Sequence, residues 1–197
     1  MGIIARFIIV LSCTALLTGC LGLETKESVV DLRKALTPIK EGNYKIEVIH
    51  PMVMKVVDDV TKTVRIINAG TSYTKIEHTG PYNTKWPKSV SFAFEKLENN
   101  FYIMSSNSKC HGWTKNEYCN YLVMVKGNDL YQWMSFCETM GGQYGLDVDR
   151  ITNTKDCEIN DKSSVRKIFK ALKKSLMKLP PSTRHFSAGV RYIYAPG

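Results

Sequence analysis

Several signatures of well-known chemistry are missing from this sequence of 197 residues. It contains no GxSxG nucleophile elbow, no HExxH zinc-binding helix and no glycine-rich phosphate loop ending in GKS or GKT. No two cysteines have the CxxC spacing that is typical of structural zinc sites. These absences argue against the commonest classes of serine hydrolase, zinc protease, nucleotide-binding protein and zinc domain.

Catalytic residue types are present, but they form no recognisable arrangement. Glu95 and Glu98 supply one pair of carboxylates of the kind that glycoside hydrolysis requires, and the chemistry of such a pair depends on its spatial separation. Asp147 and Asp149 supply a second pair. The histidines are isolated in sequence and fall in or beside expected loops: His50, His78, His111 and His185. We predict no catalytic residue and no cofactor, and a hydrolase remains an alternative.

Metal-binding patterns are incomplete. Cys110 stands next to His111, and both are zinc-ligand types, but thiols outside the cytoplasm tend to oxidise. Asp147 and Asp149 begin like a calcium-binding loop, yet Ile151 stands where an oxygen ligand belongs. We therefore predict a solvated turn over residues 147–151 and no metal site.

An uncharged apolar segment from Phe7 to Leu17 follows a single cation, Arg6. This is the layout of a secretory signal peptide, and the segment is too short to span a bilayer stably. It leads into Leu17-Thr18-Gly19-Cys20, a motif that resembles the lipobox of bacterial lipoproteins.

The lipobox resemblance implies that residues 1–19 are removed and that Cys20 becomes the lipidated first residue. Several acyl chains on one residue hold a soluble domain permanently at a membrane. Leu21 follows the cysteine, whereas Asp is the usual inner-membrane retention signal of this class, so an outer-membrane location is favoured, facing the periplasm or the cell surface. We expect a signal peptide over 1–19, a lipidated cysteine with a polar tether over 20–28, and one domain over 29–197.

Acidic residues are scarce relative to basic ones. Lys and Arg number 27 against 18 Asp and Glu, a formal net charge of +9. Removal of Arg6 with the signal peptide leaves a charge of +8 on the mature chain. A basic balance indicates an acidic partner, such as an anionic lipid, lipopolysaccharide, peptidoglycan or an acidic protein. Nucleic acid is not expected, because an exported and tethered protein rarely meets it.

Four cysteines remain beyond Cys20: Cys110, Cys119, Cys137 and Cys157. An even number in an oxidising compartment predicts two disulfides. The preferred pairing, 110–119 with 137–157, closes two short loops.

An alternative pairing, 119–137 with 110–157, would follow from a hairpin centred on Asn128. That register would also bring five side chains together on one face: Tyr121, Val123, Val125, Tyr131 and Trp133. A bond directly between neighbouring strands must meet narrow geometric limits, which counts against it.

One strong helix is expected over residues 163–178, capped by Asp161 or Ser163 and ended by Pro180-Pro181. Its apolar residues share one arc: Val165, Ile168, Phe169, Leu172, Leu176 and Leu179. Its cations share another arc: Arg166, Lys167, Lys170, Lys173, Lys174 and Lys178. The apolar arc should pack on a sheet. The cationic arc should face water or a membrane placed near it by the lipid on Cys20.

Alternating β-branched and aromatic segments predict strands over 44–49, 62–67, 72–77, 89–95, 100–105, 121–125, 130–136 and 189–194, preceded by a brief helix over 29–36. Three pairs of these segments read as hairpins. We predict an α+β fold: a mostly antiparallel meander sheet or partial barrel with one C-terminal amphipathic helix packed on it, stabilised by disulfides.

The tryptophans are a second candidate surface. Trp86 and Trp113 fall in expected loops, where exposed indoles would indicate a sugar or protein contact and buried ones would cover the ends of the sheet. Trp133 falls in an expected strand.

The sequence favours a non-enzymatic binding or structural protein of the bacterial envelope, which contacts an acidic partner through its basic helix. Two alternatives belong to other classes: a cell-wall or glycan hydrolase, and a small inhibitor or ligand-binding domain that uses an open sheet face.

Overall fold

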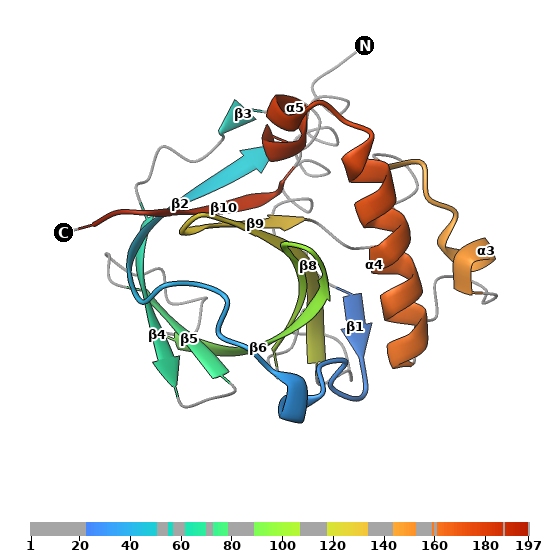
Figure 1. Ribbon diagram of the computed structural model, residues 1–197, viewed down its shortest axis with the longest axis horizontal. Helices are drawn as coiled ribbons and strands as arrows, with labels where there is room; N and C mark the ends of the chain where they lie inside the picture. Colours follow the sequence, from blue (N-terminus) through green and yellow to red (C-terminus); the bar gives the residue numbers. More distant parts are fainter. Residues whose placement is uncertain are drawn as a thin grey trace, which may run out of the picture.

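Ten antiparallel strands form one sheet in the computed structural model (Figure 1). The structure describes residues 23–50, 55–56, 62–69, 73–78, 89–106, 118–133, 144–152, 159, 161–186 and 188–196. The strands are β1 (Leu23–Thr25), β2 (Gly42–His50), β3 (Lys55–Val56), β4 (Lys62–Ala69), β5 (Tyr73–His78), β6 (Ser89–Glu98), β7 (Phe101–Ser106), β8 (Tyr118–Lys126), β9 (Asp129–Trp133) and β10 (Val190–Tyr194). The helices are the 3-10 turn η1 (Leu32–Lys34), α3 (Val148–Thr152), α4 (Lys162–Met177) and α5 (Pro181–Phe186).

Eight of these strands close into a barrel. Their order is β8-β7-β6-β5-β4-β2-β10-β9, and β9 pairs again with β8. Strand β10, which follows α4 in the chain, closes the barrel by pairing with both β2 and β9. The coarse prediction of a mostly antiparallel sheet accompanied by helices is therefore confirmed. The open sheet or partial barrel is corrected to a closed barrel, which leaves no exposed edges among its eight strands.

Successive side chains of each strand point to opposite faces of the barrel wall. Because many residues on both faces are apolar, they form two apolar layers. On β7, Tyr102 and Met104 point into the barrel, whereas Phe101 and Ile103 point outward toward α4. The most buried interior side chains are Tyr44, Val64, Ile66, Phe94, Met104, Val123 and Leu130. The outer layer joins the barrel wall to the apolar side of α4. Both faces of this wall are buried here, because one faces the barrel and the other faces the helix.

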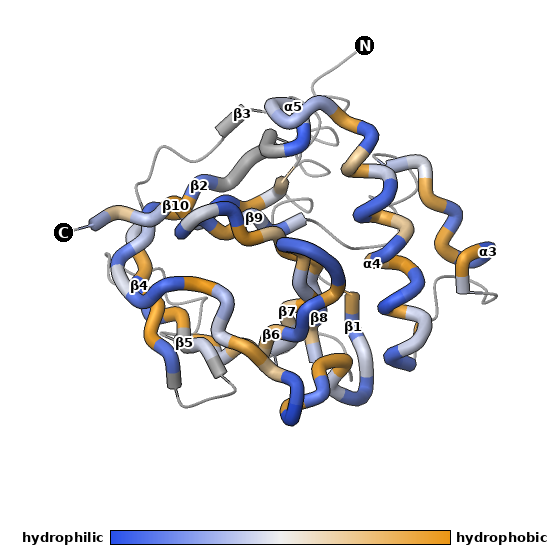
Figure 2. Tube along the Cα trace, viewed as in Figure 1, coloured by the Kyte–Doolittle hydropathy of each residue, from blue (hydrophilic) through white to orange (hydrophobic). Residues whose placement is uncertain are grey.

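Helix α4 follows its sequence signals closely. Asp161 is the N-cap and accepts a 3.0 Å hydrogen bond from the Ser164 backbone N–H. Its buried residues include Val165, Ile168, Phe169, Leu172 and Leu176, as expected. Figure 2 shows hydrophilic and hydrophobic positions alternating along it. At its end, the Arg184 guanidinium donates to the carbonyl oxygens of Leu176 and Leu179, both at 3.0 Å, which satisfies groups that a helix terminus leaves free.

The three expected hairpins are confirmed: β4–β5, β6–β7 and β8–β9. The register of the β8–β9 hairpin differs from the one that supported the 119–137 disulfide. Gly127, at φ 62°, takes the first position of a two-residue turn, so that Val123 lies opposite Gln132 and Met124 opposite Tyr131.

This register places Val123 inside the barrel, while Tyr131 and Trp133 lie outside it in the layer with α4. The five-residue cluster predicted on one face is therefore wrong. Both faces of β8 are apolar, so alternation alone did not select the register.

The segment predicted as a helix over 29–36 is mostly extended, with helical turns only at Leu32–Lys34. Val29 and Val30 are buried, the Asp31 N–H donates to Glu95 Oε2 at 2.9 Å, and the Leu36 N–H donates to the Phe94 carbonyl at 2.9 Å. A longer helix would lose these contacts with the barrel. Two further helices, α3 and α5, were not predicted, and α3 replaces the solvated turn expected over 147–151.

Part of the segment predicted as a polar tether over 20–28 forms a strand. Residues Leu23–Thr25 form β1, which pairs with the first three residues of β8. Leu23 is 3 % exposed and packs in the layer between the barrel and α4. Because Leu23 is apolar, its burial beside β8 favours this strand.

Candidate functional site

The six residues of the predicted cationic arc, which lie on α4 and at its C-cap, divide into two groups with different surroundings. Arg166 and Lys173 flank the buried stripe and face the barrel. The other four, which we name the lysine stripe, are exposed: Lys167, Lys170, Lys174 and Lys178. The sequence predicted one continuous basic face. The structure brings only the lysine stripe together on the surface.

Arg166 is committed to an internal ion pair. Its guanidinium donates to Glu95 Oε1 at 2.6 Å, and the Glu95 side chain is only 10 % exposed. The other oxygen of Glu95 accepts the Asp31 N–H. Arg166 also approaches the Val29 carbonyl at 3.5 Å. This set of contacts joins the N-terminal segment, β6 and α4 through Arg166.

Lys173 is buried at the end of the β6–β7 hairpin. Its ammonium forms an ion pair with Glu98 and lies 5.9 Å from the centroid of the Phe101 ring. The hydrogen bond and charge of Lys173, helped by the charge of Lys170, hold the pKa of Glu98 below its usual range. Glu98 remains more than half exposed, at 58 %, so this pair is open to solvent on one side.

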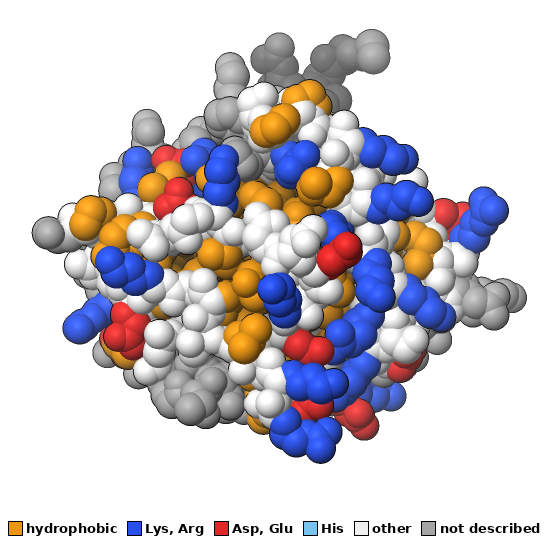
Figure 3. Space-filling model, in the orientation of Figure 1, with side chains coloured by type: hydrophobic (Ala, Val, Ile, Leu, Met, Phe, Trp, Pro, Cys, Tyr) orange, Lys and Arg blue, Asp and Glu red, His pale blue; other side chains and the backbone are white. Residues whose placement is uncertain are grey.

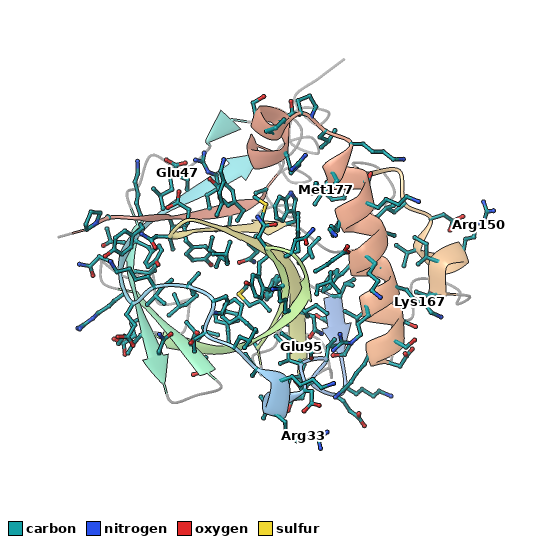
Figure 4. All side chains as sticks on the ribbon, viewed as in Figure 1. Arg33, Glu47, Glu95, Arg150, Lys167 and Met177 are labelled. Atoms are coloured by element: carbon teal, nitrogen blue, oxygen red, sulfur yellow. The ribbon has the colours of Figure 1, made fainter. Side chains whose placement is uncertain are left out.

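The lysine stripe is a compact cationic surface. Its residues recur at intervals of three and four, so at 100° per residue they occupy an arc of about 80°, and they extend over about 16 Å of helix. No ion pair joins any of the four to another described residue. Figure 3 shows Lys and Arg side chains gathered on the side of the molecule where α4 lies. Figure 4 shows Lys167 on α4 and Glu95 at the barrel wall between the strands and the helix.

An open groove lies between the lysine stripe and the barrel. It is lined by side chains from α4 and from the end of β6: Leu97, Glu98, Lys170, Lys173, Lys174 and Met177. Met177 is 48 % exposed, and it is one of three large hydrophobic residues exposed in the part of the chain that the structure describes. The groove therefore combines three ammonium groups, one carboxylate and an apolar patch. Sequence periodicity alone did not identify it, because β6 supplies two of its residues.

The carboxylates considered for hydrolysis are engaged elsewhere. Glu95 and Glu98 are each paired with a cation of α4. The low pKa of Glu98 makes it a poor general acid, since that role needs a raised pKa. Asp147 accepts the Arg150 N–H at 3.0 Å and so begins α3, which also carries Asp149. These contacts count against Glu98 as the acid of a glycosidase pair.

The barrel interior contains several tyrosines. Burial raises the pKa of Tyr44 and of Tyr192 to about 12. The Tyr44 hydroxyl donates to the Lys40 carbonyl at 2.6 Å, and the Tyr192 hydroxyl lies 3.3 Å from Gln132 Oε1. Ile39 is buried in the same cluster of interior apolar residues as Tyr44. These tyrosines remain neutral hydrogen-bonding groups at physiological pH.

Of the four cysteines predicted to form disulfides, only Cys119 lies among the described residues. It is fully buried and disulfide-bonded, with its sulfur 2.8 Å from the Tyr121 hydroxyl. Cys20, Cys110, Cys137 and Cys157 lie outside the described residues. Lipidation and disulfide connectivity therefore stay predictions.

The aromatic and histidine candidates are only partly described. Trp133 is fully buried, with its ring 5.8 Å from that of Phe101, so it belongs to the core rather than to a contact surface. Trp86, Trp113 and His111 lie outside the described residues. The side chains of the other histidines, His50, His78 and His185, are likewise outside what the structure describes.

Two other kinds of feature, a metal centre and a membrane-spanning helix, are absent from the described ranges. No group of three or more His, Cys, Asp or Glu residues there is arranged to hold a metal ion. No helix in that part of the chain is long and apolar enough to cross a bilayer. Neither a family model, a curated protein nor a solved structure matches this chain.

Proposed function

We propose that the protein is a lipid-anchored, non-enzymatic binding protein of the bacterial envelope, which presses its lysine stripe against an anionic membrane surface. The observation that carries this proposal is the stripe itself: four exposed lysines on one side of α4 that pair with no described acid. Charged residues that serve the fold, Arg166 and Lys173, face inward and have carboxylate partners. The outward lysines form no ion pair with a described carboxylate; the charge of Lys170 acts on Glu98 without such a pair.

The position of β1 supports the same orientation. Leu23 comes three residues after Cys20, the proposed lipid site, and a fully extended chain covers about 3.5 Å per residue. An anchor on Cys20 would therefore lie within about 10 Å of Leu23. Since Leu23 packs in the layer shared with α4, the lipid would hold this helix close to the bilayer. An outer-membrane location, facing the periplasm or the cell surface, remains part of the proposal.

Electrostatics gives the expected strength of the contact. Each Lys or Arg near an anionic leaflet contributes roughly 1 kcal/mol. Four lysines thus contribute roughly 4 kcal/mol if all of them reach the surface, which corresponds to nearly a thousandfold in a partition constant. This is enough to orient a domain that a lipid already holds at the membrane, although it is weak as an independent anchor.

Two disulfides in an oxidising compartment also belong to the proposal, and the bonded state of Cys119 supports it. Intact mass of the protein from its native membrane, with and without reduction, tests lipidation and disulfides together. We expect residues 20–197 plus acyl chains, with a gain of four hydrogens on reduction. An unlipidated full-length mass without that gain would contradict the anchor and the compartment.

Membrane orientation is tested with the mature chain, residues 20–197, carrying Cys20→Ser to remove the lipid. All described strands and helices lie within residues 23–196, so this chain retains them. We expect it to bind phosphatidylcholine vesicles that contain phosphatidylglycerol, to ignore vesicles without it, and to dissociate at high salt. Replacement of the four stripe lysines by Gln should weaken binding about a hundredfold or more.

A matched control changes the same number of charges elsewhere. Lys34, Lys40, Lys45 and Lys126 are exposed and lie off the stripe. Their replacement by Gln should weaken binding by less than about tenfold, because only long-range attraction is lost. Equal losses in the two sets, or binding that ignores salt, would contradict the proposal.

A further inference from the structure

The groove between α4 and the end of β6 has a charge pattern that suggests a particular ligand. Its three ammonium groups come from Lys170, Lys173 and Lys174, and its one carboxylate from Glu98. The groove therefore carries two positive charges beyond its internal ion pair. A phosphodiester carries one negative charge, whereas a phosphomonoester carries about 1.5 to 2 near neutral pH.

The buried position of Lys173 makes this groove different from a row of surface lysines. The Lys173 side chain is 11 % exposed, and Glu98 is the carboxylate that neutralises it. Lys170 and Lys174 lie on the adjoining stripe with no ion pair to a described acid. A phosphate entering the groove would thus meet two free ammonium groups and a third whose present partner is largely exposed.

Apolar side chains adjoin the cations. Leu97 and Met177 line the same groove, and Met177 is about half exposed. An inorganic anion would gain nothing from them. A lipid would cover them with its glycerol and upper acyl carbons, which is favourable because apolar surface leaves water. Figure 4 shows Met177 toward the α5 end of α4.

We infer that this groove is a headgroup site for a lipid bearing a phosphomonoester, with the phosphate bound by Lys170, Lys173 and Lys174 and the lipid backbone lying on Leu97 and Met177. This inference rests on the proposed membrane orientation and adds a specific lipid class to it. Glu98 competes with the phosphate for Lys173, so it tunes affinity from within the site.

The test compares vesicles of equal surface charge that contain either phosphatidic acid, a phosphomonoester, or phosphatidylglycerol, a phosphodiester. The probe protein is residues 20–197 with Cys20→Ser. We expect the partition constant for phosphatidic acid to exceed that for phosphatidylglycerol by roughly fivefold or more, because an added charge-assisted contact is available only to the monoester.

Four single variants decide whether the groove carries this preference. Lys170→Gln and Met177→Gln should each reduce the ratio of the two constants toward one, and both residues are exposed enough to be replaced without harm to the core. Glu98→Gln should raise the ratio, since it frees Lys173. Lys167→Gln, on the stripe but outside the groove, should weaken both constants by the same factor and leave their ratio unchanged.

The outcomes distinguish the groove site from the membrane orientation. If both lipids bind equally and replacement of the stripe lysines by Gln abolishes that binding, the groove site is overturned and the membrane orientation stands. A preference that survives Lys170→Gln and Met177→Gln would also overturn the groove site. Absence of binding to either vesicle would overturn the proposed orientation, and the groove site with it.

Discussion

The two sides of α4 show how differently cations are used on one helix. Arg166 and Lys173 face the barrel, where they form ion pairs with the carboxylates of Glu95 and Glu98. Lys167 and Lys174 face outward and meet solvent. The inward pair belongs to the architecture, because a charge in that position needs a partner. The outward lysines are free of that constraint, and this makes them the better evidence for an external contact.

The largest effect is expected from the apolar side of α4. Phe169 is fully buried between the helix and the barrel, so Phe169→Ala should lower the free energy of unfolding by about 3 to 5 kcal/mol. Urea denaturation followed by circular dichroism measures this. Met177→Ala, on the same helix but half exposed, should cost less than about 1 kcal/mol. Similar costs at the two positions would mean that α4 does not pack as described.

The inward ion pair comes next. Arg166→Met leaves Glu95 almost buried without its cation, and it should destabilise the protein by roughly 1 to 3 kcal/mol, less than a fully buried pair because Arg166 is 31 % exposed. The double variant with Glu95→Gln should recover part of that loss, since no uncompensated charge remains. Unfolding free energies of the two single variants and the double variant measure the coupling, and purely additive losses would show that the residues act independently.

The helix cap should have a smaller, pH-dependent effect. Hydrogen bonds from the Ser164 hydroxyl and backbone N–H lower the pKa of Asp161 below its ordinary value of 3.8. A carboxyl group whose pKa is lowered by folding stabilises the folded state at pH values above its ordinary pKa. This stabilisation is lost as the pH falls through the lowered pKa. Asp161→Ala should therefore cost about 1 kcal/mol at neutral pH. The difference from the native chain should disappear in strong acid, and a difference that is constant with pH would contradict this role.

The smallest effect on stability is expected from the lysine stripe. Replacement of Lys167, Lys170, Lys174 and Lys178 by Gln should change the free energy of unfolding by less than about 0.5 kcal/mol per residue. The same variant should lose most of its vesicle binding. Thermal unfolding and vesicle sedimentation of one preparation measure both properties. A large loss of stability would mean that these lysines serve the fold, like Arg166 and Lys173.

The limits of sequence reasoning are visible within α4 itself. Its boundaries, its cap and its buried stripe were predictable, because each depends on residues within a few turns of one another. The separation of its cations was not, because it depends on distant partners. Arg166 meets a carboxylate 71 residues earlier in the chain, on β6. Helical periodicity places Arg166 near the edge of the polar arc. At that position the local pattern is consistent with a side chain that faces the barrel and equally with one that faces solvent.

In the barrel, too, features set by neighbouring segments were predictable and features set by distant segments were not. Hairpins β4–β5, β6–β7 and β8–β9 join neighbouring segments, so turn residues and alternation were sufficient to predict them. Closure depends on β10, which returns after α4 and pairs with β2, nearly 150 residues away in sequence. The β8–β9 register was also missed, because burial on both faces removes the polar positions that normally reveal it.

The sequence by itself determined the local elements, the excess of positive charge and the amphipathic helix, since these follow from composition and short-range periodicity. Only the tertiary structure decided that the sheet closes, that two of the six cations of the predicted arc turn inward, and that β6 and α4 form a groove together. The reason is physical: closure and charge pairing are free-energy balances between groups far apart in the chain, and no local pattern contains both partners.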